Sequence, residues 1–124
     1  MLGYLIFGGA LGTVARYGLQ GWVQARLGQT TFPAGTLAVN ILGSFVLGFV
    51  ARVATGTVLV TPEARAGLTI GFCGAFTTMS TFAYETMALV GDGDYSRGAL
   101  YTVASLGGCL VAVYAGTMLA NRLL

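Results

Sequence analysis

The stretch GFCGAFTTMSTFAYET, residues 71–86, carries the most informative pattern in this chain. It lies in a long apolar run, yet it contains Gly71, Gly74 and a cluster of hydroxyl side chains at Thr77, Thr78, Ser80 and Thr81. One or two hydroxyls can bond back to their own helix, but this many beside two glycines favour a helix that is interrupted at mid-membrane depth. A helix that is only kinked, with its hydroxyls bonded internally, is the alternative that the segment alone leaves open.

An interruption at this depth would create a polar site. An interrupted helix exposes backbone carbonyls, which a membrane tolerates only where protein or a polar cavity satisfies them. Freed carbonyls are good ligands for a hard cation such as sodium. The segment is therefore the first place to look for ion chemistry.

The composition of the whole chain predicts an all-α integral membrane protein. Of its 124 residues 56% are hydrophobic and 8% are charged, against roughly 25% charged in a soluble domain. About 20 apolar residues cross a hydrocarbon core about 30 Å thick, so residues 1–124 have room for four transmembrane helices in one domain and little else. We expect a multi-pass protein of the cell (plasma or inner) membrane. The N-terminal apolar run lacks a basic region before it and is expected to be the first span rather than a signal peptide.

Turn and capping residues place the ends of the spans. Thr61, Pro62 and Glu63 form a helix-start pattern of a capping hydroxyl, a proline and an acid, and Pro33 suits the first turn of another helix. Residues 91–94, GDGD, form a turn. We therefore expect spans at about residues 2–23, 33–52, 63–90 and 95–119, with loops at about 24–31 and 55–63.

The twenty glycines predict closely packed helices. Small residues let transmembrane backbones approach one another where no hydrophobic force drives association. Pairs four residues apart, on one helix face, occur at Gly8 and Gly12, at Gly67 and Gly71, and at Ala104 and Gly108.

Three ordered motifs resemble the Fluc (CrcB) family of fluoride channels and together cover nearly the whole chain. They are GGALGTVARY at 8–17, GTLAVNILGSFVLG at 35–48 and GFCGAFTTMSTF at 71–82. The resemblance implies a dual-topology, antiparallel homodimer in the lipid bilayer, with two fluoride pores and passive export of toxic fluoride from the cytoplasm. It also implies one structural sodium ion at the breaks of the two third helices, held by the backbone carbonyls of Gly74 and Thr77. No catalytic activity and no nucleic-acid partner are expected.

Two pathway residues follow from the resemblance and have a physical rationale. The buried amide maps onto Asn40, whose NH2 group can replace part of the hydration shell of fluoride; because a bare amide is costly in lipid, a packing partner is the alternative explanation. The aromatic wall maps onto Phe82, whose ring edge is positive and can meet an anion. A plain core position is the alternative for Phe82.

The chain departs from the family pattern at Met79. Family members usually carry two phenylalanines three residues apart in this segment, and Met79 occupies the first of the two positions. Met79 and Phe82 still share a helix face. A thioether lacks the positive edge of a ring, which leaves the anion contact at Met79 in doubt.

The other candidate pathway residues are polar groups within the spans. Tyr101 and Ser105 lie at helical spacing and, with Ser80 and Thr81, could form a row of hydroxyls. Glu85, an acid in an apolar stretch, either organises these hydroxyls near a pore mouth or pairs with an arginine. In the family an arginine that matches Arg16 lies near the pore entrance, where it would gather anions; snorkelling to the membrane surface is the alternative.

Competing functions fit the residues less well. A small multidrug-type, proton-coupled transporter has the same size and span number, but it needs an acid in the first span, and residues 2–23 contain none. A membrane assembly factor would explain the glycines but not the hydroxyl cluster. The chain has no histidine, and we expect Cys73 and Cys109 to act as small apolar residues rather than as a metal pair or a disulfide.

The distribution of arginines predicts dual topology. In a four-span chain one side of the membrane carries Arg52, Arg65 and Arg122, and the other carries Arg26, Arg97 and, by proximity, Arg16. Because orientation is set by the excess of Lys and Arg on one side, a balanced chain should insert both ways. C-terminal fusions to a cytoplasmic reporter and to a periplasmic reporter should therefore both be active; activity of only one of them would contradict the dual-topology hypothesis.

Overall fold

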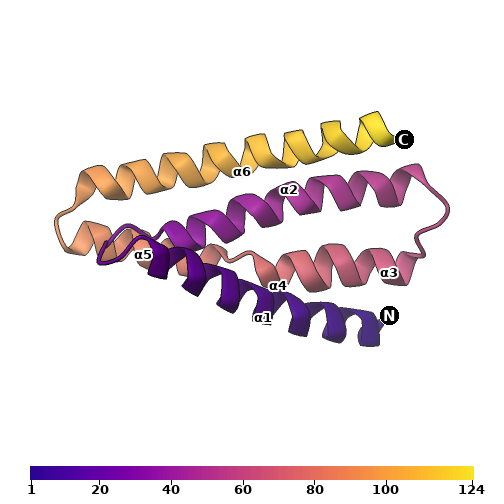
Figure 1. Ribbon diagram of the computed structural model, residues 1–124, viewed down its shortest axis with the longest axis horizontal. Coiled ribbons are helices and arrows are strands. Elements are labelled where there is room, and N and C mark those ends of the chain that lie inside the picture. Colours follow the sequence, from indigo (N-terminus) through magenta and orange to yellow (C-terminus); the bar gives the residue numbers. More distant parts are fainter.

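The computed structural model describes residues 1–124 and is entirely helical (Figure 1). The elements are α1 (Leu2–Arg26), α2 (Ala34–Gly56), α3 (Pro62–Ala66), the π-helix η1 (Gly67–Cys73), α4 (Gly74–Phe76), α5 (Met79–Gly91) and α6 (Tyr95–Leu123). The elements α3, η1, α4 and α5 follow one another as a single bent rod, so the chain forms four rods that run up and down. Both termini and the α2–α3 connection lie at one end of the molecule (Figure 1).

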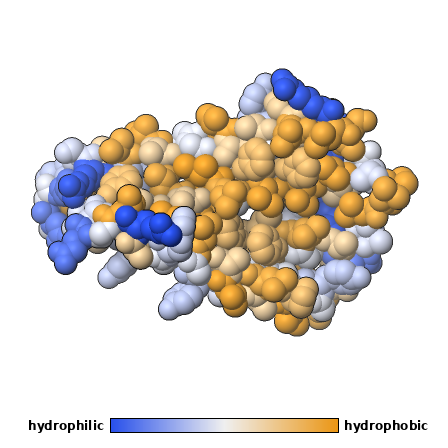
Figure 2. All heavy atoms as spheres, viewed as in Figure 1, coloured by the Kyte–Doolittle hydropathy of each residue, from blue (hydrophilic) through white to orange (hydrophobic).

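Three of the four rods are long and apolar enough to cross a membrane. They are Ala34–Gly56, Pro62–Gly91 and Tyr95–Leu123. The α1 helix has 25 residues, among them Arg16, Gln20 and Gln24, and is not one of these three. Apolar side chains cover the middle of the face in Figure 2, and polar ones gather mainly toward its two ends. This division fits an all-helical, multi-pass membrane protein with four helices.

The predicted span ends were correct to within a few residues, and the helices run further than expected. The α1 helix continues to Arg26, and Gln24 in its last turn binds the segment that follows: its Nε2 donates to the Phe32 carbonyl in the loop (3.1 Å), and its Oε1 accepts from the Gly35 N–H in the first turn of α2 (3.1 Å). The α2 helix extends to Gly56 and α6 to Leu123, and Arg52 and Asn121 hydrogen-bond across these two ends.

The predicted helix start at residues 61–63 and the turn at residues 91–94 are confirmed. The Thr61 hydroxyl accepts the Ala64 N–H (3.2 Å) at the start of α3. In the α5–α6 connection, Gly93 has φ +76°, a left-handed conformation that favours glycine. Asp94 then caps α6 by accepting the Arg97 N–H (3.2 Å). Pro33 lies at the cap position of α2 rather than in its first turn.

The third rod is broken, as its sequence predicted. Thr77 (φ −90°, ψ 159°) and Thr78 (φ −151°, ψ 110°) are extended and separate α4 from α5. The π-helical turn of η1 precedes the break. The alternative of a continuous, merely kinked helix is therefore wrong, because two successive residues leave the helical conformation altogether.

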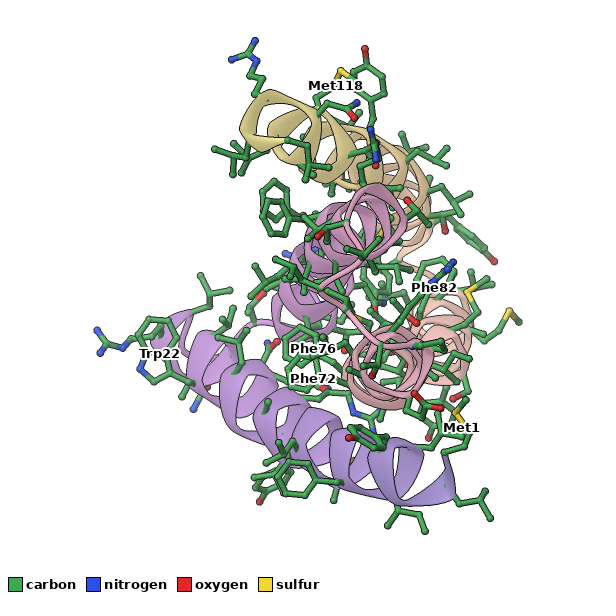
Figure 3. All side chains as sticks on the ribbon, turned by 90° about the vertical axis from the view of Figure 1, so that its right-hand side faces the viewer. Met1, Trp22, Phe72, Phe76, Phe82 and Met118 are labelled. Carbon is green, nitrogen blue, oxygen red and sulfur yellow. The ribbon has the colours of Figure 1, made fainter.

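Glycines bring the rods into backbone contact, as expected. A Cβ atom added at Gly8 would collide with the Gly67 carbonyl, and one at Gly12 would collide with the Phe72 carbonyl. These contacts seat α1 on η1, with α1 crossing the other helices at an angle (Figure 3). A Cβ atom at Gly48 or Gly116 would likewise collide with backbone carbonyls where α2 packs against α6.

The packing of α1 on η1 can be tested with two glycines of the same helix. Gly8→Ala should destabilise the protein by about 1–3 kcal/mol, because the new methyl group meets backbone that cannot move aside easily. Gly3→Ala is the matched control, since nothing lies within 4 Å of its Cβ position, and alanine favours a helix. Thermal unfolding in detergent should show a lower midpoint for Gly8→Ala only; equal midpoints would contradict this contact.

Candidate functional site

A groove between α2, α5 and α6 brings together four of the predicted pathway residues. It has a volume of about 270 Å³; α2 and α5 each contribute one pair of side chains three or four residues apart, and α6 contributes two such pairs. Its polar and aromatic lining is Asn40 and Ser44 from α2, Met79 and Phe82 from α5, and Ser105 and Cys109 from α6, with Leu106 and Leu110 beside them. Residues that are up to 70 positions apart in sequence thus meet at one site.

Asn40 is buried and holds the break of the third rod. Its Oδ1 accepts the Thr78 N–H (2.7 Å), and its Nδ2 donates to the Thr78 carbonyl (3.1 Å). Because a backbone N–H donates to an oxygen, these two bonds also distinguish Oδ1 from Nδ2 in the amide of Asn40. One N–H of Asn40 is used in this way, and the second N–H is left for another acceptor. Asn40 therefore has the packing partner that its burial requires and keeps one donor.

Thr78 connects the break to the start of α5. Its hydroxyl oxygen accepts the Thr81 N–H (3.2 Å), which caps α5, and it donates to the Thr81 hydroxyl (2.9 Å). The Ser80 hydroxyl lies 3.5 Å from the same oxygen. The hydroxyls of this cluster therefore serve mainly to end one helix and begin the next.

Ser105 carries the one buried polar side-chain atom without a hydrogen-bond partner in the chain. Its side chain is only 5% exposed, and its Oγ has no protein partner. A buried hydroxyl that bonds to nothing is costly, so a group of this kind indicates a bound partner. Since Ser105 lines the groove, the groove is where that partner would lie.

Phe82 forms the aromatic wall of the groove, and other aromatic rings pack behind it. The Phe82 ring lies 5.1 Å from the ring of Tyr101, which is fully buried, and Tyr101 in turn meets Phe32 edge-on at 5.7 Å. In Figure 3 Phe82 lies apart from Phe72 and Phe76, which point toward α1. Met79 borders the same groove but is 68% exposed, so it forms an outer rather than an inner part of the wall.

Glu85 is bound by hydroxyls rather than by an arginine. Its Oε1 accepts hydrogen bonds from the Thr36 hydroxyl (2.6 Å) and from the Tyr101 hydroxyl (3.4 Å). Gln20 Nε2 donates to the same Thr36 hydroxyl (3.1 Å). The one ion pair of the chain joins Arg97 and Asp94 (3.6 Å). Of the two alternatives for Glu85, the geometry favours the organisation of hydroxyls.

Glu85 also borders a second, more polar hollow near the α1–α2 loop. This hollow has a volume of about 380 Å³ and is lined by Tyr17, Gln20, Gly21, Gln24, Thr31, Pro33 and Glu85. Tyr101 therefore contacts residues of both sites. Its ring packs against Phe82 of the groove, and its hydroxyl donates to Glu85 of the polar hollow. Most of the side chains that line the polar hollow can be hydrated.

Arg16, Ser80 and Thr81 are not part of either lining. Thr81 is joined to the site through Thr78, and Ser80 is exposed beside the break. Arg16 is half-buried on α1 and makes no hydrogen bond or ion pair within the chain. The chain alone thus brings Asn40, Phe82, Met79 and Ser105 together and leaves Arg16 apart.

The carbonyls of Gly74 and Thr77 have lost their helical donors. In a continuous helix they would accept the N–H groups of Thr78 and Thr81. Those N–H groups donate instead to Asn40 Oδ1 and to the Thr78 hydroxyl. Two carbonyl oxygens at a break suit a hard cation, which prefers oxygen ligands, so the residues fit the expected sodium ion.

The comparison with known proteins covers nearly the whole chain. Residues 3–117 match the family model described as CrcB-like protein, Camphor Resistance (CrcB). This chain belongs to the CrcB-like family. Among its relatives, the Fluoride-specific ion channel FluC of Geobacter sulfurreducens is 50% identical over 115 residues, which are 93% of this chain and 92% of the relative. Proteins of the same name from Chlorobaculum tepidum (48% over 114 residues; 92% and 89%) and Geotalea uraniireducens (43% over 120 residues; 97% and 96%) are also similar.

Sequence reasoning missed several residues of the site in this CrcB-like chain. Thr78 was seen as one hydroxyl of a cluster, although its place three residues before Thr81 is a capping pattern that could have marked it. Thr36 lies four residues before Asn40, on the same helix face, which is a usable signal. Ser44, four residues after Asn40, and Cys109, four residues after Ser105, carry the same signal of a shared helix face. No local pattern indicated Gln20.

The role of Thr78 in starting α5 can be tested by removing only its hydroxyl. Thr78→Val should cost about 1 kcal/mol of stability, the usual effect of losing a capping oxygen. It should also speed hydrogen exchange at the Thr81 amide. Thr69→Val is the matched control, because the Thr69 hydroxyl bonds only the Arg65 carbonyl of its own helix (2.8 Å). Unchanged exchange at Thr81 in the Thr78 variant would contradict the assignment.

Proposed function

We propose that this chain forms a fluoride-selective channel that lets fluoride leave the cytoplasm passively and so lowers its toxicity. The observation that carries this proposal is the nearly end-to-end similarity to proteins named fluoride-specific ion channels. These relatives are named as channels rather than as drug transporters, assembly factors or enzymes. The groove supplies a physical route for the same activity.

The groove offers fluoride neutral hydrogen-bond donors in place of water. Fluoride is small and strongly hydrated, so a pathway must supply donors to compensate for lost water. Asn40 keeps one free N–H, and the buried Ser105 hydroxyl has its O–H free to donate. Phe82 adds a ring whose edge is positive and which brings no acceptor that would repel an anion. Donors without a fixed positive charge favour binding that is weak enough to permit release.

Glu85, Tyr101 and Thr36 form the link between the groove and the polar hollow. Because Glu85 accepts two hydroxyl donors, its carboxylate positions those hydroxyls at the edge of the fluoride route. We assign the polar hollow around it to the pore mouth. For Arg16 we retain the role of attracting anions to an entrance. For Ser80, Thr81 and Met79 we retain a position beside the fluoride route.

The functional unit that we propose is an antiparallel homodimer of dual topology. In the single chain the groove opens sideways, since Met79, Leu106 and Leu110 border it and are each more than half exposed. A channel wall cannot be left open to lipid, so a second copy would complete it. The arginines divide three against three between the two sides of the four-span chain, with Arg16 assigned by proximity, which gives neither orientation an advantage.

We further propose that a structural sodium ion joins the two copies through the carbonyls of Gly74 and Thr77. Gly74 is exposed in the single chain, so its carbonyl can be shared with a partner. A bound cation would neutralise the exposed carbonyl dipoles and keep the break in one conformation. Liposomes that contain N-methylglucamine in place of sodium test this proposal, and efflux that is unaffected by sodium removal would contradict it.

The proposed channel predicts fluoride efflux from liposomes that contain the purified chain, with chloride excluded. Asn40→Asp should abolish the efflux. Aspartate can still accept the Thr78 N–H, but its negative charge lies where the anion must pass, and a repulsion of only ~1.4 kcal/mol slows passage about tenfold. A fluoride electrode records the efflux.

The matched control for Asn40→Asp is Asn121→Asp, which makes the same exchange at the end of α6. Asn121 is exposed and bonded to Arg52, so a carboxylate there should leave efflux unchanged. If Asn40→Asp liposomes lose fluoride as fast as the parent, Asn40 does not line the route. If the parent itself releases no fluoride, the proposed function is wrong.

A further inference from the structure

Cys109 is a free cysteine, as the sequence predicted, and it lies in the groove between α2, α5 and α6. It follows Tyr101 and Ser105 at intervals of four residues on α6, which places the three side chains on one helix face. Cys109 lines the groove together with Asn40 and Met79. It is a free, partly exposed thiol.

The surroundings of Cys109 indicate a ligand-binding site. One turn before it, Ser105 holds a hydroxyl that is almost fully buried and has no partner. A group attached at Cys109 would lie inside this groove, beside the Asn40 and Ser105 side chains.

The other cysteine provides a contrast within the same chain. Cys73 is only 2% exposed and lies in η1, the segment on which the glycines of α1 pack. Reactive cysteines are accessible, whereas buried structural cysteines are inert. The two thiols should therefore differ sharply in their reaction with a small electrophile.

We propose that Cys109 is a modification site on the ion route, and that a small, neutral, thiol-reactive molecule closes the channel by reacting there. The inference rests on the proposed function, because closure presupposes conduction. With methyl methanethiosulfonate, the Cys109 sulfur forms a disulfide bond to the methylthio sulfur of the reagent. The sulfur–sulfonyl bond breaks, methanesulfinate leaves with the bonding electrons, and the thiol proton passes to water. A reducing thiol reverses the reaction by disulfide exchange.

The experiment treats the protein in liposomes with methyl methanethiosulfonate and compares each variant with its own untreated sample. Fluoride efflux should fall at least about tenfold in the parent and in Cys73→Ala, and dithiothreitol should restore it. Cys109→Ser and Cys109→Ala should keep the efflux rates of their untreated samples; two variants guard against one that fails to fold. Mass spectrometry of the parent should find the methylthio group on Cys109 and not on Cys73.

The outcomes separate this inference from the proposed function. Complete modification of Cys109 with unchanged efflux overturns the inference, and so does an unmodified Cys109 under conditions that modify an exposed cysteine peptide. Inhibition that persists in both Cys109 variants assigns the effect to another residue and also overturns it. If the untreated parent does not conduct fluoride, the proposed function fails, while the labelling of Cys109 over Cys73 still shows whether the groove is accessible.

Discussion

The pair of hydrogen bonds between Asn40 and Thr78 is the constraint on which the rest of this structure depends. An extended segment inside a membrane leaves peptide groups without helical partners, at a cost of several kcal/mol each. Asn40 satisfies both polar groups of Thr78 with one side chain, because an amide side chain has the same donor and acceptor as a peptide. The break can then persist, α5 can begin anew, and the carbonyls of Gly74 and Thr77 are released from helical bonding.

Asn40 reaches the break only because α2 comes unusually close to it. Gly43, one turn further along α2, faces the break, and a Cβ atom there would collide with the side chains of Thr77 and Phe76. The same principle holds α1 on η1 and α2 on α6, where glycines meet backbone carbonyls. Close packing is thus a condition for the polar site as well as a source of stability.

The hydroxyl groups differ in their hydrogen bonding, and this difference distinguishes Ser105 from the other hydroxyl residues of the helices. Thr13, Thr69, Thr86 and Thr102 each donate to the carbonyl four residues earlier in their own helix, which is how membrane helices commonly satisfy such side chains. Ser105 differs because its hydroxyl is buried in a groove and bonds to nothing. The combination of burial, location and missing partner, rather than residue type, identifies the site.

The membrane setting, the four helical rods and the glycine contacts could be predicted from the sequence, because composition, hydrophobic run length and residue spacing act over short stretches of chain. The glycines and hydroxyls favoured a break in the third rod, but the choice between a break and a kink came from the extended conformations of Thr77 and Thr78. Asn40, Met79 and Phe82 were predicted as site residues from two of the three local motifs, and Ser105 from its helical spacing to Tyr101. The tertiary structure adds that Asn40 binds Thr78, that Glu85 is held by Thr36 and Tyr101, and that Cys109 and Ser44 border the groove. These facts depend on which faces of three helices meet, and that is fixed by contacts between residues distant in sequence, which no local pattern records.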